Sequence, residues 1–241
     1  MSVPKTVVIL AAGFGSRLDA PEGHKILAEL GGRPLIDWHL EAFARANVEE
    51  VVVVTGFNHE ALSEALEAWD LPEGMSIRTV FNPKFELSNG VSILSAEAET
   101  PFWLTMGDHL IQPDLFDRIG ELAEYCGENG VGGALAVDYE LDAVFDMPDA
   151  NKVRLIDGKL DAIGKELDDF GCVDVGLFWC GEQFVEALRA ELAERGDCNT
   201  SDAMRRLDAA GQALFWDVGS AWWQDVDTPG ARAHAEKLIA R

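Results

Sequence analysis

Hydrophobic positions along the first half of the chain form short apolar runs that alternate with segments of helical periodicity. Four such runs are typical of buried strands and lie at residues 7–10, 50–55, 77–81 and 102–106. Apolar residues at helical spacing occupy 35–45 and 60–69, and a further helix is expected to begin near Gly90. Strands that are apolar throughout and alternate with helices predict a mostly parallel sheet with helices on both faces.

The pattern changes after about residue 130, where the strand-like pieces become more closely spaced. They lie at 134–137, 152–156, 159–163 and 173–180, and Asp157-Gly158 predicts a hairpin turn between the middle two. Helices are expected at 182–195, at 200–210 and after Pro229, with a strand at 213–218 that runs on through Trp223. We therefore expect an α/β fold: a single doubly wound, mostly parallel mixed sheet in one domain over residues 1–241, with a small inserted β region.

Composition narrows the classes of partner. The net charge is −24, from 43 acidic and 19 basic residues, and a field of that sign repels the phosphates of a nucleic acid. No apolar run approaches the ~20 residues that span a membrane, and no signal peptide is recognisable. We expect a cytoplasmic protein without a membrane segment or a nucleic-acid partner. The four cysteines have no metal-ligand spacing and are expected to be reduced thiols.

A glycine-containing loop follows the first predicted strand, in Leu10-Ala-Ala-Gly-Phe-Gly-Ser-Arg-Leu18. Small residues allow close approach of a ligand to the backbone, whose N–H groups suit phosphates or base edges. The loop lacks the spacing of a dinucleotide fingerprint and the Gly-Lys-Ser/Thr of a P-loop. Arg17 and the downstream Lys25 suit a triphosphate instead, with Arg17 on the β/γ oxygens and Lys25 near the α-phosphate. An ordinary strand-to-helix turn remains the alternative.

Three aspartates in two segments of the chain are candidate metal ligands. Asp108 follows the strand at 102–106, so it is expected at the carboxyl edge of the sheet, where ligands bind in open α/β folds. Asp225 and Asp227 precede the predicted closing helix. Mg²⁺ needs only one or two carboxylates together with phosphate oxygens and water. The alternative is structural, because Asp227 or Thr228 is also a good N-cap before Pro229.

Several segments together resemble the sugar nucleotidyltransferase superfamily of MobA-like, GT-A type NTP transferases. They are the glycine loop with Lys25 and Gly32-Arg-Pro-Leu-Ile, then Asn82-Pro with Ser88-Asn-Gly-Val-Ser92, Thr105-Met-Gly-Asp-His109, Gly164-Lys-Glu166, Val173-Asp-Val-Gly-Leu-Phe178 and Trp223-Gln-Asp-Val-Asp-Thr-Pro-Gly230. Among its groups, the Gly-Asp-His and Trp-x-Asp-Val-Asp-Thr-Pro pieces are most similar to inositol-1-phosphate cytidylyltransferases.

The resemblance implies a role for each matching residue. Catalysis falls to Arg17 and Lys25, and the metal ligands are Asp108, Asp225 and Asp227, with Asp225 as the principal second ligand. Nucleotide binding falls to Leu10, Ala11, Ala12, Gly13, Gly15, Ser16, Ser88, Asn89, Ser92 and Gly107, and acceptor binding to Lys165, Glu166 and Asp174. Residues 1–130 would form the nucleotide-binding half and residues 131–241 the acceptor-binding half. The five histidines are expected to be structural, with His109 nearest the site.

The expected activity is transfer of CMP from CTP to a phosphorylated polyol, with inositol 1-phosphate favoured and Mg²⁺ as cofactor. A homodimer is left open. A related transferase that acts on a sugar 1-phosphate, phosphocholine or an aminoalkylphosphonate is the nearest alternative. A non-catalytic nucleotide-binding regulator is the alternative from another class, and a nicotinamide oxidoreductase is a third.

Overall fold

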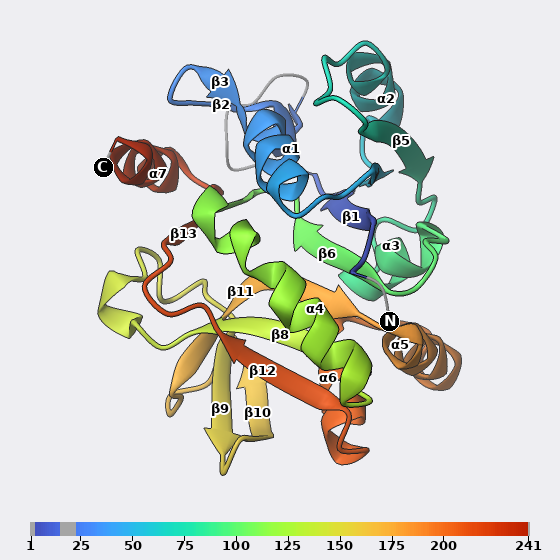
Figure 1. Ribbon diagram of the computed structural model, residues 1–241, viewed down its shortest axis with the longest axis vertical. Coiled ribbons are helices and arrows are strands. Elements are labelled where there is room, and N and C mark those ends of the chain that lie inside the picture. The colour runs from blue at the N-terminus through green and yellow to red at the C-terminus, as the bar shows by residue number, and fades with distance from the viewer. Residues whose placement is uncertain (1–2, 15–22, 241) are drawn as a thin grey trace.

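A sheet of nine strands occupies the centre of the described part of the molecule (Figure 1). The computed structural model describes residues 3–14 and 23–240. Along its main path the strand order is β10-β9-β11-β6-β1-β4-β5, and β8 and β12 extend the sheet from β11. At one end of this order, four neighbouring strands run parallel: β1 (Thr6–Ala11), β4 (Glu50–Thr55), β5 (Ser76–Phe81) and β6 (Phe102–Met106).

Strand β11 (Cys172–Cys180) turns the sheet antiparallel. It pairs antiparallel with β6, with β8 (Gly133–Asp138) and with β9 (Lys152–Ile156). Strand β10 (Lys159–Gly164) closes a hairpin with β9, and β12 (Ala213–Asp217) returns parallel to β8. The expected α/β class and mixed, doubly wound sheet are confirmed, and every antiparallel pair of this sheet includes β9 or β11 from the second half.

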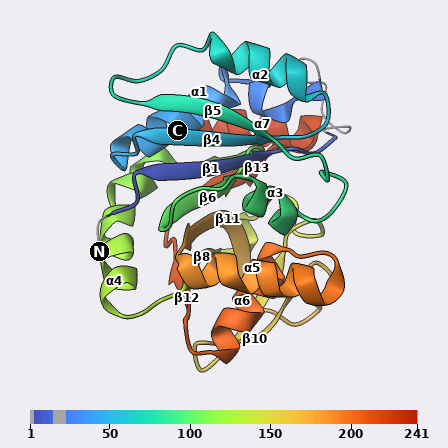
Figure 2. The same ribbon diagram turned by 90° about the vertical axis from the view of Figure 1, so that its right-hand side faces the viewer.

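Helices cover both faces of the sheet because its central strands β1, β4 and β6 are apolar on both sides. The helices are α1 (Leu35–Arg45), α2 (His59–Glu67), α3 (Asn89–Ser95), α4 (Ile119–Glu128), α5 (Glu182–Arg195), α6 (Thr200–Ala209) and α7 (Pro229–Ile239). Alternate residues of β1 enter different cores: Val7 and Ile9 pack in the core of α1 and α4, and Val8 in that of α3, α5 and α6. Figure 2 shows α5 and α6 toward the viewer and α4 at the left edge of the sheet.

The segment before the closing helix differs from its prediction. Instead of one run from residue 213 through Trp223, β12 ends at Asp217 and a separate strand, β13 (Trp223–Asp225), pairs antiparallel with β7 (His109–Ile111). The chain turns at Gly219, which has φ +64° and donates its N–H to Asp217 Oδ1 at 2.7 Å. This turn directs residues 223–225 toward β7 and sets Asp225 opposite His109.

Short elements complete the described chain. They are the hairpin of β2 (Glu29–Leu30) with β3 (Arg33–Pro34) and the 3-10 turns η2 (Lys25–Leu27), η3 (Pro113–Asp117) and η4 (Leu141–Ala143). Among the helices in the described ranges, none combines the length and apolar character that crossing a bilayer would require.

Candidate active site

The glycine loop borders a cavity of about 230 Å³ at the carboxyl end of β1. Of the predicted residues, it brings together Leu10, Ala11, Gly13, Lys25, Gly107 and Asp108. Gly107 donates its N–H to the Leu10 carbonyl at 2.9 Å, and a Cβ there would lie 2.8 Å from that oxygen, which explains the glycine. Ala12 is buried beside this lining, and its carbonyl accepts the Phe57 N–H. Gly15, Ser16 and Arg17 lie outside the described residues.

A second cavity, of about 870 Å³, lies where the two halves of the chain meet. Its lining combines polar residues from both halves: Ser88, Asn89, His109, Asp138, Asp149, Asn151, Lys165, Asp174, Thr200, Ser201, Asp225 and Asp227. The predicted nucleotide residues Ser88 and Asn89 therefore share one cavity with the predicted acceptor residues Lys165 and Asp174.

Lys25 connects the two cavities through its ammonium group. Its Nζ lies 2.8 Å from Asp108 Oδ2 in the smaller cavity and forms a second ion pair with Asp227 Oδ1 in the larger one. All three side chains are largely buried. Burial acts to raise the pKa of Asp108, but the positive charges of His109 and Lys25 outweigh it and hold that pKa below the ordinary value. The arrangement fixes a cation between two carboxylates at the sheet edge.

Asp225 stands on β13 beside this ion pair. Its Oδ1 is buried and accepts no hydrogen bond from any residue in the described ranges. Burial is the main cause that raises the pKa of Asp225, and the nearby His109 partly opposes it. Asp225 also belongs to two groups whose ligand atoms lie within 4.8 Å of one another, Asp108–His109–Asp225 and Asp149–Asp225–Asp227. A buried carboxylate oxygen of this kind is well suited to a divalent cation.

The structure decides between Asp227 and Thr228 as the N-cap of α7. The Thr228 side chain accepts the Ala231 N–H at 3.1 Å, with Pro229 at the first helical position, so Thr228 is the N-cap. Asp227 instead faces Lys25.

The structure gives His109 defined contacts in the candidate site, whereas the sequence indicated only that it lies near that site. Its Nδ1 lies 2.7 Å from the Val175 carbonyl, which can only accept, so Nδ1 carries the proton. The ring stacks on Trp223 at 5.8 Å. Burial lowers the pKa of His109, but the Asp225 and Asp108 carboxylates reverse this and raise it overall. The ring also touches Gly176, whose φ of +78° and missing Cβ leave room for it. The signal in the sequence was its position directly after Asp108.

Two of the three predicted acceptor-binding residues, Lys165 and Asp174, line the larger cavity. Lys165 Nζ pairs with Asp149 Oδ1 at 2.7 Å, and both line the larger cavity. Asp174 accepts hydrogen bonds from Asn151 Nδ2 at 3.1 Å and from the Gly176 N–H at 2.7 Å, while burial raises the pKa of Asp174. Glu166 is exposed and stands outside the residues that line either cavity.

Lys152 is a buried residue that sequence reasoning missed. Its Nζ donates to the carbonyl oxygens of Pro148, at 3.4 Å, and of Lys165. It thereby ties together the backbones on which Asp149 and Lys165 stand. No local pattern marks this lysine, because its two partners come from separate loops.

Ser92 lies apart from the other predicted nucleotide residues. It is 4% exposed, and its Oγ accepts Asn82 Nδ2 at 2.9 Å in the interior. Among the described residues it belongs to the lining of neither cavity, so its contact is with the loop that leads to α3.

Comparison with known proteins gives the class to which this fold and site belong. The family model of the MobA-like NTP transferase domain matches residues 7–139, which is more than half of the chain. The chain belongs to this family.

Individual relatives show which members of the family the chain resembles. The chain is 32% identical over 236 residues to a "Bifunctional IPC transferase and DIPP synthase" of Rubrobacter xylanophilus, covering 96% of this chain and 51% of the relative. It is 29% identical over 251 residues to the "CMP-5'-(3-aminopropyl)phosphonate synthase" of Streptomyces rubellomurinus, covering 98% and 39%. The chain spans about half the length or less of these curated relatives. The inositol-1-phosphate CTP transferase from T. maritima shares the fold, with a TM-score of 0.80, 23% identity and coverage of 99% and 96%.

Proposed function

We propose that the chain transfers CMP from CTP to a phosphorylated polyol, with inositol 1-phosphate favoured, and releases pyrophosphate. The observation that carries this proposal is the position of Lys25 between the two cavities, paired with Asp108 on one side and Asp227 on the other. A triphosphate along the glycine loop and a phosphorylated acceptor beside Lys165 would meet at this point. The names of the relatives support the choice of CTP and of an inositol phosphate.

The reaction is an in-line displacement. An acceptor phosphate oxygen forms a bond to the α-phosphorus of CTP while the bond from that phosphorus to the bridging oxygen of the β-phosphate breaks. Pyrophosphate carries away the electron pair, and the acceptor needs no general base because it is already an anion. Lys25 stabilises the charge that develops at the α-phosphate, and Lys165 orients the attacking phosphate.

We infer that Mg²⁺ is the cofactor and that Asp108, Asp225 and Asp227 hold it. The fit rests on the hard oxygen ligands and on the buried Asp225 Oδ1, which finds no hydrogen-bond donor within the described ranges. When bound, the ion supplies charge neutralisation at the phosphate oxygens. The Asp174 carboxylate, held by Asn151 and the Gly176 N–H, accepts hydrogen bonds from acceptor hydroxyls.

A second acceptor class is a phosphonate or phosphate ester that carries an amine. The larger cavity has many carboxylates around a single lysine, including Asp138, Glu140, Asp142, Asp146 and Asp149. Such a lining attracts an ammonium group, and one relative is named for an aminopropylphosphonate product.

Pyrophosphate release across four triphosphates and a panel of acceptors tests the proposal. We expect turnover with CTP and inositol 1-phosphate that a chelator abolishes and added Mg²⁺ restores. The panel includes glucose 1-phosphate, phosphocholine and 3-aminopropylphosphonate. Robust turnover of UTP or dTTP with glucose 1-phosphate, and none of CTP, would reject the cytidylyl assignment.

Lys165→Ala is expected to act on the acceptor alone. Because Lys165 lines the larger cavity, away from the glycine loop, its loss should raise the acceptor KM or lower acceptor turnover by ~10-fold. The KM for CTP should change little. Lys159→Ala, an exposed lysine of the neighbouring hairpin, is the matched control. An equal loss of CTP affinity in Lys165→Ala would contradict the division into two substrate sites.

A further inference from the structure

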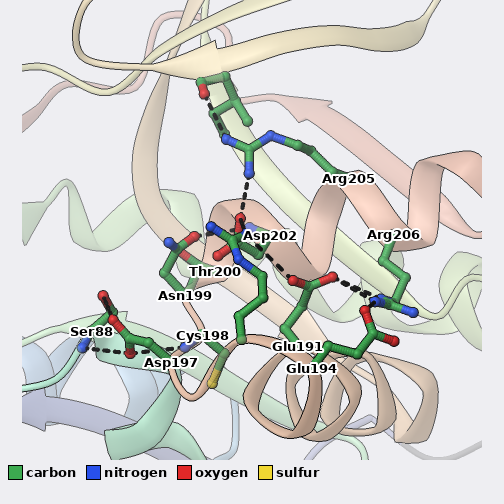
Figure 3. Close-up of polar contacts among 12 residues, drawn as sticks. Ser88, Glu191, Glu194, Asp197, Cys198, Asn199, Thr200, Asp202, Arg205 and Arg206 are labelled. Carbon is green, nitrogen blue, oxygen red and sulfur yellow. Dashed lines mark hydrogen bonds and ion pairs between the residues drawn. The ribbon is translucent and has the colours of Figure 1, made fainter.

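The turn between α5 and α6 holds the N-terminus of α3. Asp197 Oδ1 accepts the backbone N–H groups of Ser88, at 3.0 Å, and of Cys198, at 2.8 Å. Asp197 Oδ2 lies 2.7 Å from Ser88 Oγ (Figure 3). Gly90 also donates its N–H to the Cys198 carbonyl, and a Cβ at Gly90 would lie 2.5 Å from that oxygen. The two segments are 109 residues apart in sequence and are in direct backbone contact.

The contact with Asp197 decides which way the Ser88 hydroxyl points. A carboxylate can only accept, so the single hydroxyl proton of Ser88 is donated to Asp197 Oδ2. Although burial acts to raise the pKa of Asp197, the hydrogen bonds from Ser88 outweigh it and lower that pKa, which keeps the carboxylate ionised. Ser88 lines the larger cavity, and toward a ligand there its Oγ has only lone pairs to offer.

Asn89 has the opposite character. The Thr200 backbone N–H can only donate, and it lies 3.1 Å from Asn89 Oδ1, which fixes the orientation of the amide. Asn89 Nδ2 then faces Thr200 Oγ1 at 3.4 Å. A primary amide has two N–H groups, and this contact uses one of them. Ser88 and Asn89 thus place a hydrogen-bond acceptor beside a donor in the lining of one cavity.

When Ser88 Oγ meets the group at C4 of the base and Asn89 Nδ2 meets N3, this acceptor and donor are complementary to cytosine and not to uracil. The polar edge of cytosine presents an amino group, which donates, beside the ring nitrogen N3, which accepts. Uracil presents a carbonyl, which accepts, beside an N3–H, which donates. A site whose polar groups are already committed rejects the mismatched ligand, because groups of both partners stay unpaired.

We propose that Asp197 is the positioning residue that makes the site select cytosine over uracil, by holding the Ser88 hydroxyl so that it can only accept. This rests on the proposed function in so far as the ligand is a pyrimidine nucleotide. Asp197 itself acts through Ser88 and touches no substrate.

Further polar contacts lie on both sides of the turn that carries Asp197 (Figure 3). Asn199 Oδ1 caps α6 by accepting the Asp202 N–H at 2.9 Å, and Asp202 pairs with Arg205 at 2.5 Å. Arg206 on α6 pairs with Glu191 and Glu194 on α5, both at 2.7 Å. The Arg206 pairs join the helices on either side of the turn, so the Ser88 contact is made by a pre-organised group.

Asp197→Asn tests the inference because it reverses the direction of the hydrogen bond between residue 197 and Ser88 Oγ. The Ser88 and Cys198 N–H groups require an oxygen at Oδ1, so the new amide nitrogen takes the place of Oδ2 and donates to Ser88 Oγ. The Ser88 proton is then free to face the cavity, where it suits the uracil carbonyl. We expect the ratio of the Kd values for CTP and UTP, measured by calorimetry with Mg²⁺ and without acceptor, to shift toward UTP by ~10-fold or more.

Matched variants separate this role from a structural one. Ser88→Ala should itself reduce the preference for CTP, and Asp197→Asn should leave the ratio unchanged in the Ser88→Ala background. Glu186→Gln, at an exposed carboxylate on α5, should keep the wild-type ratio. An equal weakening of both nucleotides in Asp197→Asn, or an unchanged ratio in Ser88→Ala, overturns the inference. A wild-type protein that prefers CTP in binding but transfers no CMP would contradict the proposed function alone.

Discussion

Replacing Lys25 by alanine is expected to lower kcat by ~10²-fold or more, because a donor that stabilises charge in the transition state contributes ~2.7–4 kcal/mol. Lys25 is held by Asp108 and Asp227, and this places its ammonium where the two cavities meet. Removing it also leaves these two carboxylates without their cation, so triphosphate binding should weaken as well.

Steady-state kinetics with saturating CTP and acceptor provide the measurement, and circular dichroism checks that the variant stays folded. Lys84→Ala removes an exposed lysine that borders neither cavity in the described chain, so it should keep wild-type kcat. A wild-type kcat in Lys25→Ala would remove Lys25 from the chemistry.

Asp225→Asn is expected to weaken divalent-cation binding by ~10–100-fold and to lower turnover correspondingly. The change removes the charge of a carboxylate whose buried Oδ1 has no donor among the residues of the described ranges. Mn²⁺ binding followed by electron paramagnetic resonance reports the affinity without any turnover. Raising Mg²⁺ in the activity assay should recover part of the loss, because mass action refills a weakened site.

Asp227→Asn is the matched comparison. Thr228 already caps α7, so this change should leave the helix intact and loosen the hold on Lys25 instead. We expect a lower kcat with a smaller change in the Mn²⁺ affinity. If Asp227→Asn weakens the cation and Asp225→Asn does not, the assignment of the principal ligand is reversed.

The sequence was sufficient for the main strands and helices. The runs at 50–55 and 102–106 match β4 and β6, and the helix at 182–195 matches α5, because long apolar or periodic segments carry their own signal. The ladder of β7 with β13 was missed because strands of three residues are too short to show a period. Helix α4 was also missed, although its buried residues Ile119, Leu122, Ala123 and Cys126 have helical spacing.

The candidate site was predicted only where its residues lie in a motif next to a recognisable strand. Motifs beside strand ends, such as Asp108 after β6, can be placed by the rule that ligands bind at the carboxyl edge. The sequence does not show which side chains from distant segments pair with one another. Lys25 and Asp108 are 83 residues apart, and Ser88 and Asp197 are 109 residues apart. In a chain with 43 acidic residues, nothing local distinguishes Asp149 or Asp197 from a solvated surface carboxylate.

Phosphorus NMR of the reaction products tests the transfer of CMP most directly. The protein is incubated with CTP, inositol 1-phosphate and Mg²⁺, and the phosphorus signals are followed over time. We expect two mutually coupled signals from the diphosphate that joins cytidine to inositol in the product, formed together with an equal amount of pyrophosphate. Pyrophosphate that appears with CMP and without the coupled signals, or CTP and inositol 1-phosphate that both remain unchanged, would contradict the transfer.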